Sequence, residues 1–382
     1  MQTKKKILVM IDWFVPGYKA GGPIRSCVNL VLALKNEFAI YVLTTDTDHG
    51  ESAPYQDIPS NEWITGTLDP AIHVFYAKKK TLTVKQLKEQ IDLIAADFIY
   101  LNHLFSPYFV VYPLWLKYNN KIAGKIILSP RGALYDSALS VKPYKKRPFL
   151  FLFKRMKMDK QIRFHATNER ERTAIEQYFP GSNILVADNL PDQNQPAFTS
   201  VGKIAGSIKC VFIARIVPIK NLLFFLNVLE QVNTTVQFTI AGPVEDENYW
   251  NECKKKIAQL PATVKVDYIG AKKHEALTAI IQQHHLYVLP TIGENFGHAI
   301  FEALSAGRIV LISDQTPWLN LAEHNAGWDV SLNDRDGFVS VVEKVAAWGQ
   351  EEFDKKSLAA WKYAGNIIKA TGIKEKYLEL FS

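Results

Sequence analysis

Two carboxylates in the second half of the sequence are spaced so that both can face one ligand. Glu294 and Glu302 lie in the stretch GENFGHAIFEALSAG, which runs from Gly293 to Gly307. The segment Ala-Ile-Phe-Glu-Ala-Leu predicts a helix, so Glu302 falls among apolar residues, where an unpaired carboxylate is costly to bury. Either this side chain faces water, or it has a partner that the local sequence does not contain.

The stretch around these carboxylates is suited to a phosphorylated sugar. Phe296-Gly297 precedes or begins the expected helix, whose free amides and positive dipole end attract a phosphate. Glu302 can accept hydrogen bonds from a ribose diol, and Glu294, in the preceding turn, can hold sugar hydroxyls. On this interpretation the missing partner of Glu302 is a ligand.

Other strand-to-helix loops carry groups of complementary chemistry. In CVFIARIVPIKNLLFF, Arg215 ends an expected strand and Lys220 opens the next helix, and two such cations suit a diphosphate. Ile269-Gly270 ends another strand with a small residue, against which a flat base can lie. Gly21-Gly22 precedes the first expected helix, a place for phosphate or an ordinary turn. The dinucleotide fingerprint G-x-G-x-x-G does not occur in the chain.

Short apolar runs alternate with amphipathic stretches, which predicts parallel sheets covered by helices. The pattern restarts after Asn189-Leu190-Pro191, so we expect an α/β protein with two Rossmann-like, doubly wound domains and a cleft between them. Residues 1–190 form the expected N-terminal domain and 208–361 the C-terminal one. The segment 191–207, rich in Pro, Gly, Ser, Gln and Asn, is the expected linker.

Composition excludes several classes of protein. The 382 residues are 48% hydrophobic and 22% charged, as in a globular protein of two domains. Cys27, Cys210 and Cys253 are too scattered for a disulfide framework or a zinc ribbon, which indicates reduced thiols in a cytoplasmic protein. No stretch reaches the roughly 18 apolar residues of a spanning helix. The apolar run from Ile7 to Ile11 predicts a strand, not a signal peptide.

The net charge of +7 is concentrated in one segment. Residues 142–160 (KPYKKRPFLFLFKRMKMDK) hold eight basic residues and one acid, Asp159. An aromatic cluster flanked by basic residues suits an anionic membrane surface. The alternative is a solvated helix whose aromatic residues face the core. Nucleic acid is not an expected partner, because no recognisable nucleic-acid module surrounds the segment.

Taken together, these residues resemble a known family. Glu294-x7-Glu302 with Phe296-Gly297 looks like the E-x7-E motif of retaining glycosyltransferases of family 4 (group 1), which have the GT-B fold. Arg215 and Lys220 match the paired cations of that family's diphosphate site, and Gly21-Gly22 matches its N-terminal Gly-rich loop. The resemblance covers nearly the whole chain.

The resemblance implies a UDP- or GDP-sugar donor in the C-terminal domain and a glycan or lipid-linked acceptor in the N-terminal domain. It implies transfer with retained configuration and without a metal or other cofactor, because the cations and helix amides stabilise the leaving diphosphate. It also implies bacterial surface polysaccharide synthesis, at the inner face of the cytoplasmic membrane. The last helix, about 362–382, is expected to return to the N-terminal domain.

The resemblance assigns roles to named residues. The catalytic residues would be Glu294, Arg215 and Lys220. The donor-binding residues would be Gly22, Ile269, Gly270, Phe296, Gly297, His298 and Glu302, although His298 fits a helix-surface histidine equally well. The acceptor-side or sugar-side candidates are Gly21, His103 and Arg131.

The sequence also departs from the family. Arg131, in Ser129-Pro130-Arg131-Gly132, stands where many relatives have a histidine, and His103 is the other option for that histidine. The family's Gly-Gly after the following strand is replaced by SDQTPW, with Thr316 and Trp318 as possible donor or acceptor contacts.

Three alternatives stay open at this point. Asp46-Thr47-Asp48 is a D-x-D, the metal-binding pattern of a different transferase fold, and Asp334-Arg335-Asp336 matches the same short pattern. His284-His285 has no partner at metal-ligand spacing, and we interpret it as structural or exposed. A nucleotide-sugar epimerase on the same fold would keep the phosphate site without an acceptor. A non-catalytic scaffold would tolerate loss of all four charged site residues.

Overall fold

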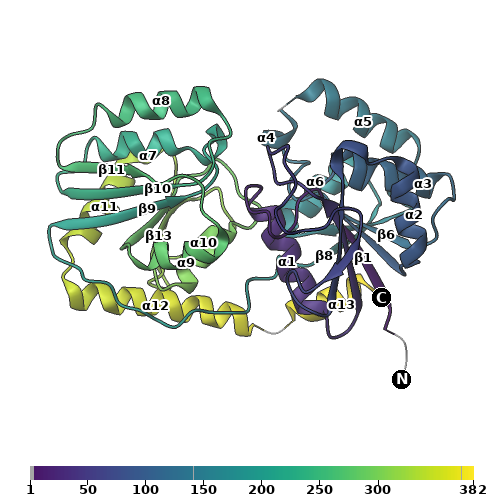
Figure 1. The fold of residues 1–382 in the computed structure, drawn as a ribbon. Helices are drawn as coiled ribbons and strands as arrows, with labels where there is room; N and C mark the ends of the chain where they lie inside the picture. The colour runs from purple at the N-terminus through teal and green to yellow at the C-terminus, as the bar shows by residue number, and fades with distance from the viewer. Residues whose placement is uncertain (1–3, 141, 371) are drawn as a thin grey trace. The chain divides into compact units, whose positions relative to one another are not determined.

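The computed structural model describes residues 4–140, 142–370 and 372–382 of the chain. These residues form two compact units, each built around its own sheet (Figure 1). One unit contains residues up to Leu190 together with the C-terminal helix, and the other contains residues 191–370. The expected pair of doubly wound α/β sheets is confirmed.

The sheet of the first unit has the strand order β3-β4-β2-β1-β5-β6-β7-β8. All neighbours are parallel except β3 and β4, which pair antiparallel at one edge. Its strands are β1 (Lys6–Met10), β2 (Ala39–Thr45), β3 (Trp63–Thr65), β4 (Ile72–Ala77), β5 (Phe98–Asn102), β6 (Lys125–Ser129), β7 (Arg163–Ala166) and β8 (Asn183–Val186). Its helices are α1 (Gly22–Leu34), α2 (Val84–Ile94), α3 (Tyr112–Tyr118), α4 (Asp136–Leu139), α5 (Pro143–Arg155), α6 (Glu169–Tyr178) and α13 (Ile373–Leu380).

The sheet of the second unit is parallel throughout, with the order β11-β10-β9-β12-β13-β14. Its strands are β9 (Ser207–Ile213), β10 (Thr235–Ala241), β11 (Val264–Tyr268), β12 (Leu286–Leu289), β13 (Ile309–Ser313) and β14 (Gly327–Val330). Its helices are α7 (Leu222–Leu229), α8 (Glu247–Ile257), α9 (His274–Gln282), α10 (His298–Ser305), α11 (Arg335–Ala347) and α12 (Gln350–Lys369). Figure 1 shows α7 and α8 on one face of this sheet, and α9, α10 and α12 on the other.

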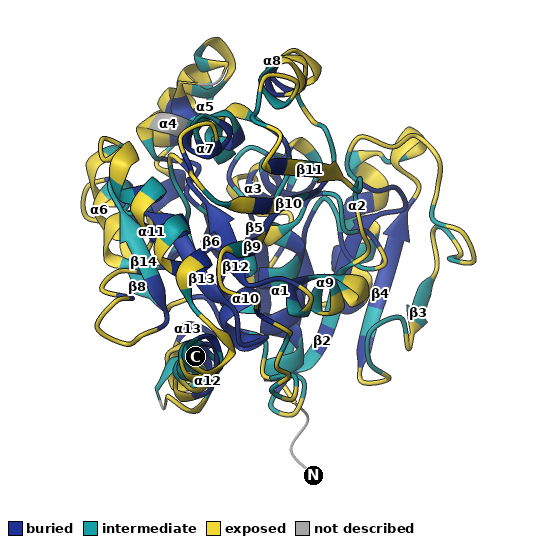
Figure 2. Ribbon diagram, turned by 90° about the vertical axis from the view of Figure 1, so that its left-hand side faces the viewer, coloured by how far each residue is buried: buried dark blue, intermediate teal, exposed yellow. Residues whose placement is uncertain are grey.

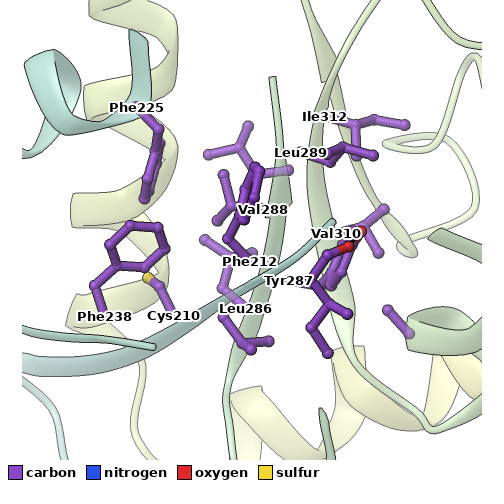
Figure 3. Packing of buried hydrophobic residues seen from close by; sticks show 14 of the residues in the cluster. Cys210, Phe212, Phe225, Phe238, Leu286, Tyr287, Val288, Leu289, Val310 and Ile312 are labelled. Carbon is purple, nitrogen blue, oxygen red and sulfur yellow. Dashed lines mark hydrogen bonds between the residues drawn. The ribbon is translucent and has the colours of Figure 1, made fainter. Parts of the chain in front are cut away.

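Helices on both faces explain why the central strands are apolar throughout. All five residues of β13, with the sequence IVLIS, are buried. On one side of the sheet, Phe225 of α7 packs its ring 5.1 Å from that of Phe238 of β10 (Figure 3). The dark strands of Figure 2 show the same burial in the first unit. The two sheets are therefore rigid supports for the loops that follow their strands.

Two expected boundaries differ in the structure. The segment 191–207 does not hang free, because Lys203 is buried and donates to four backbone carbonyls, those of Ile204, Ser207, Ala346 and Trp348. Residues 191–206 therefore belong to the second unit. The return to the first unit begins after Ala370, not near residue 362, because α12 continues to Lys369 and buries its apolar face in the second unit.

Candidate functional site

The loops that carry the predicted site lie on both sides of a reversal in strand order. In the second sheet, β9 lies between β10 and β12, so the chain winds outward from β9 in one direction and from β12 in the other. In open parallel sheets, ligands bind at the carboxyl ends of the strands at such a switch point. Arg215 and Lys220 follow β9, and Glu294 follows β12, so the fold brings them to one edge.

The loops after β9 and β12 are joined by hydrogen bonds and by an ion pair. The Ile292 amide and the Thr291 hydroxyl both donate to the Ile219 carbonyl, at 2.8 and 3.0 Å. The Lys220 ammonium forms an ion pair with the Glu294 carboxylate, and their side chains are only 15% and 14% exposed. A candidate cation and a candidate carboxylate, each expected to contact a ligand, are therefore paired with each other in the structure.

The loop after β12 leads into α10 through a left-handed glycine. Gly297 has φ of 79° at the N-cap of α10, a conformation that favours glycine. The Trp318 indole donates to the Phe296 carbonyl, and the two rings lie 5.3 Å apart. His298 is buried beside Phe296, with ring centroids 4.7 Å apart, so it is not a surface histidine. Trp318 thus holds the residue that precedes the N-cap of α10.

The partner of Glu302 includes a residue that the sequence analysis did not single out. Glu302 lies on α10 with a side chain 17% exposed, and its carboxylate is 3.8 Å from Nδ1 of His274. His274 begins α9, four residues after Gly270, in the loop that follows β11. Its position in a strand-to-helix loop was the one available signal, because no spacing links it to Glu302.

Arg215 also has a carboxylate partner. Its Nη1 donates to Glu245 at 2.6 Å, and the two side chains are 35% and 32% exposed. Glu245 comes from the loop after β10, next to the loop after β9. The sequence analysis did not identify it, because nothing in the sequence relates these two residues.

A buried tyrosine lies on β12, the strand that precedes Glu294. Tyr287 of β12 is fully buried and donates to the Ile213 carbonyl at 3.2 Å. Burial raises the pKa of its hydroxyl well above the ordinary value, and the charges of Glu294 and Glu302 raise it further. The charges of both carboxylates therefore oppose ionisation of this buried hydroxyl.

The backbone expected to receive a base follows β10 and β11. The Ile269 amide donates to the Ile240 carbonyl at 2.9 Å, and the Gly242 amide donates to the Gly270 carbonyl at 3.0 Å. Gly270 has φ of 72° and no atom within 4 Å of where a side chain would begin. A flat group can therefore approach the Gly270 backbone closely.

The acceptor-side candidates all lie in the first unit. Gly21 caps α1 with φ of 67°. Gly22, which the resemblance assigns to donor binding, is the first residue of that helix and lies in the first unit as well. His103 follows β5 with φ of 77°, and burial lowers its pKa to about 4. It therefore carries no charge at neutral pH, and its Nδ1 accepts from the Phe105 amide at 3.2 Å.

Arg131 is engaged within the protein. Its three nitrogens donate to Asn102 at 2.8 Å, to Tyr100 at 2.8 Å and to Asn189. Tyr100 in turn contacts the buried His165, whose Nδ1 lies 2.8 Å from the tyrosine oxygen. The structure thus gives Arg131 an internal role that the expectation of a ligand contact did not include.

The acids of the D-x-D alternative hold backbone. Asp48 accepts from the amides of Tyr18 and Lys19 at 2.9 and 3.2 Å. Asp46 accepts from Ser60 at 2.8 Å and from the Lys79 amide at 3.2 Å. Over the described residues, His, Cys, Asp and Glu side chains form no cluster of three or more that could hold a metal ion.

The second D-x-D and the histidine pair also have structural roles. Asp334 caps α11 by accepting from the Gly337 amide at 2.8 Å. His284 and His285 are both buried. The ring of His284 contacts the Thr239 hydroxyl at 2.8 Å, and that of His285 contacts the Gly202 carbonyl at 2.9 Å. The structural interpretation of the histidine pair is confirmed.

The basic segment 142–160 contains α5, which has one buried and one exposed face. Leu150 and Phe153 are buried, whereas Phe151 and Leu152 are 73% and 54% exposed. The described part of the chain has no helix long and apolar enough to cross a membrane. On its exposed face, α5 presents the large apolar side chains of Phe151 and Leu152 to solvent among its lysines and arginines.

Comparison with known families and curated proteins gives related results. Residues 194–364 match the model of the family described as glycosyl transferases group 1. A GDP-mannose:cellobiosyl-diphosphopolyprenol alpha-mannosyltransferase of Xanthomonas oryzae pv. oryzae (strain PXO99A) is 32% identical over 125 residues, which are 32% of this chain and 33% of that protein. The protein of the same name from Xanthomonas campestris is 24% identical over 254 residues, 65% of this chain and 66% of the relative. The matches thus span about a third and about two thirds of these relatives.

Solved structures extend the similarity to the whole chain. Anabaena HepE in complex with UDP and glucose superimposes with a TM-score of 0.71 at 15% identity, covering 98% of this chain and 99% of that one. At this identity the similarity concerns the fold. The expected GT-B fold, with two Rossmann-like domains, is confirmed.

Proposed function

The chain belongs to the glycosyl transferases of group 1 through residues 194–364, and from this premise we propose that it moves a sugar from a nucleotide-sugar donor to a lipid-linked glycan. The observation that carries the proposal is the ion pair of Lys220 and Glu294 at the switch point of the second sheet, with Arg215 in the same loop as Lys220 and α10 following Glu294 in the chain. These groups match in type and position what a diphosphate and its attached sugar require.

In this proposal the second unit binds the donor. Arg215, Lys220 and the amides at the start of α10 hold the diphosphate and stabilise the negative charge that develops as the sugar leaves. Glu294 exchanges Lys220 for hydroxyls of the donor sugar, and Glu302 accepts from the ribose. His298 lies beside the sugar, and the base rests on the backbone of Ile269 and Gly270.

We propose that the reaction retains the anomeric configuration and proceeds without a metal. The two cations and the helix amides supply the charge stabilisation that a divalent ion supplies in other transferases. The support is the E-x7-E spacing of Glu294 and Glu302 together with the ion pair of Lys220. A mechanism of this kind needs no further cofactor.

The acceptor side is proposed for the first unit. Gly21 and the neutral His103 lie after β1 and β5, at the carboxyl ends of the central strands of its sheet. The Xanthomonas relatives are named for a diphosphopolyprenol acceptor, which supports a lipid-linked acceptor in bacterial surface polysaccharide synthesis. Arg131 would support this region through Asn102 and not by direct contact.

Thermal stability with a panel of nucleoside diphosphates and nucleotide sugars tests this proposal. The panel includes UDP- and GDP-sugars, because the curated relatives are named for GDP-mannose and the solved structure contains UDP. With EDTA present, a donor at about 100 times its dissociation constant should add about 2.7 kcal/mol to the free energy of unfolding. The shift should disappear in Glu302→Ala and persist in Glu323→Ala, a control in the same unit. A shift that requires added metal would contradict the metal-free mechanism.

We further propose that α5 binds the anionic inner surface of the cytoplasmic membrane. Its exposed Phe151 and Leu152 would insert at the interface, and its basic residues would attract anionic headgroups. The patch lies on the same unit that is proposed to bind the lipid-linked acceptor, so docking would bring that unit to the membrane.

Vesicle binding tests the membrane proposal. A variant with glutamine at four exposed positions, Lys145, Arg147, Lys154 and Arg155, should lose at least about tenfold in affinity for phosphatidylglycerol vesicles, since each basic residue near the surface contributes about 1 kcal/mol. Lys146 is left intact because its ammonium bonds to the Ala138 carbonyl at 2.6 Å. A control removes four exposed lysines of the second unit, Lys254, Lys255, Lys265 and Lys355. Equal binding by both variants would contradict a role for α5.

A further inference from the structure

Both cations of the proposed diphosphate site have a carboxylate partner. Lys220 pairs with Glu294, and Arg215 pairs with Glu245. Glu294 and Glu302 have expected partners in the donor, namely sugar and ribose hydroxyls. Glu245 has no such expected partner, so its presence on Arg215 needs a separate explanation.

The position of Glu245 is built into the backbone. An isolated parallel bridge between Ile216 and Val244 extends the pairing of β9 and β10 beyond the strand ends. The Ile216 amide donates to the Pro243 carbonyl at 2.9 Å, and the Glu245 amide donates back to the Ile216 carbonyl at 3.3 Å. Asp246, the next residue, caps α8 through the Tyr249 amide at 3.0 Å. Glu245 is therefore held opposite Arg215 by the main chain.

Glycine permits this arrangement. Gly242 has φ of 145°, and a Cβ there would lie 1.9 Å from the Ala214 carbonyl oxygen. A larger residue would push the loop after β10 away from the loop after β9. The close approach that places Glu245 on Arg215 thus depends on a specific residue type.

The carboxylates of the proposed donor site outnumber its two cations. Arg215 and Lys220 bring two positive charges to the site, and Glu245, Glu294 and Glu302 bring three negative ones. A nucleoside diphosphate adds further negative charge, so its binding to this arrangement is opposed unless carboxylates leave the cations. A carboxylate oxygen on Arg215 occupies one of the donor positions that a phosphate oxygen would use.

We infer that Glu245 is an internal competitor for the donor diphosphate. It leaves Arg215 when the donor binds, and it returns as the nucleoside diphosphate product departs, which limits product inhibition. This inference rests on the proposed function, since it assigns the diphosphate to Arg215. The exchange replaces one ion pair with another and involves no covalent step.

Titration calorimetry with UDP, GDP and inorganic pyrophosphate, in EDTA, tests the inference. Glu245→Gln keeps the size of the side chain and removes its charge, so it should bind the better of the two nucleotides about tenfold more tightly than the wild type at low salt. The gain should shrink at about 0.5 M salt, because screening weakens the repulsion between partly exposed charges. Glu247→Gln, two residues further on, removes an exposed carboxylate and should change the affinity less than twofold.

The outcomes separate the two levels of the argument. Unchanged or weaker nucleotide binding by both Glu245→Gln and Glu245→Ala, with wild-type melting temperatures, would overturn the competitor role and leave the donor site in place. Failure of the wild type to bind any of the three probes would overturn the proposed function and this inference together. An equal gain in Glu247→Gln would also overturn the inference, since it would reflect general charge and not the contact with Arg215.

Discussion

Lys220 is the residue on which the proposed chemistry depends most directly. Its side chain is mostly buried and paired with Glu294, and it lies at the switch point where a leaving diphosphate would develop charge. We predict that Lys220→Ala lowers the rate of sugar transfer by about 100-fold to 1,000-fold, the usual effect of removing one preorganised stabilising group. The measurement is the steady-state kcat with saturating donor.

Lys256→Ala is the matched control for Lys220. Lys256 also pairs with a carboxylate in the second unit, that of Glu230, and its side chain is 15% exposed, as for Lys220. Its loss should leave the kcat within about twofold of wild type, since surface ion pairs contribute little. A similar fall in both variants would mean that general stability, not diphosphate stabilisation, explains the effect.

Glu171 shows that not every buried carboxylate in this chain belongs to a ligand site. It is fully buried and accepts from the Gly132 amide at 2.5 Å and from the amide and hydroxyl of Thr167 at 2.7 and 2.6 Å. Glu171→Gln brings an amide NH2 against groups that already donate. We predict a loss of about 2–3 kcal/mol in the free energy of unfolding.

The control for Glu171 lies on the same helix. Glu176 of α6 is about half exposed and pairs with Arg172. Glu176→Gln should cost less than about 0.5 kcal/mol. Chemical denaturation of both variants makes the comparison, and equal midpoints would contradict the account of Glu171.

The site residues separate into those that the sequence could identify and those that it could not. Glu294, Glu302 and Lys220 follow strands or enter a helix at recognisable spacings, and the structure gathers them at one sheet edge. His274 and Glu245 contact Glu302 and Arg215 from loops elsewhere in the chain. Such contacts depend on how neighbouring loops pack, and no local spacing records them.

At the scale of elements, the loops after β9 and β10 pack closely against each other, and this packing places Glu245 on Arg215. Gly242→Ala would place a Cβ 1.9 Å from the Ala214 carbonyl oxygen at a backbone φ of 145°. We predict a loss of more than about 3 kcal/mol in the free energy of unfolding. Thermal unfolding of the variant measures this loss.

Gly206→Ala separates the clash from the backbone conformation. Gly206 has φ of 86° but no atom within 4 Å of the added Cβ. Its substitution should cost about 1 kcal/mol, from the left-handed conformation alone. Equal losses of unfolding free energy in Gly242→Ala and Gly206→Ala would show that the clash with Ala214 does not contribute to the cost.

Alternating strands and helices were predictable because each carries a periodic apolar pattern. The residues at which these elements end, and the structure of the segments between them, were less predictable. The composition of 191–207 is typical of a linker, yet Lys203 in this segment is buried. Its ammonium donates to four backbone carbonyls, two from nearby residues and two from the end of α11 and the residues after it. The long α12 likewise continues past residue 362, because its core contacts lie in the second unit.

At the scale of the whole molecule, buried histidines in both units link stability to pH. Burial lowers the pKa of His165 to about 3 and that of His285 to about 4. An unfolded histidine titrates near about 6.5. Between about pH 4 and 6.5 the unfolded chain therefore binds more protons than the folded one, and the free energy of unfolding falls as the pH falls, by up to about 1.4 kcal/mol per pH unit for each histidine.

Melting temperatures measured between about pH 4.5 and about pH 7 test this linkage. His165→Gln should be less stable at pH 7 and lose less stability on acidification than the wild type. His324→Gln, at an exposed position, should follow the wild-type curve. Parallel curves for the wild type and His165→Gln would contradict the assignment of the pH dependence to this buried ring.

The central claim is that the switch point of the second sheet transfers a sugar from a nucleotide donor. Its most direct test is product formation from GDP-mannose and from UDP-glucose, in EDTA, with a diphospholipid-linked cellobioside as acceptor, followed by NMR of the new linkage. We predict transfer from one of these donors, with the donor's anomeric configuration kept in the product, and its loss in Lys220→Ala but not in Lys256→Ala. An inverted linkage, or transfer that does not depend on Lys220, would contradict the account.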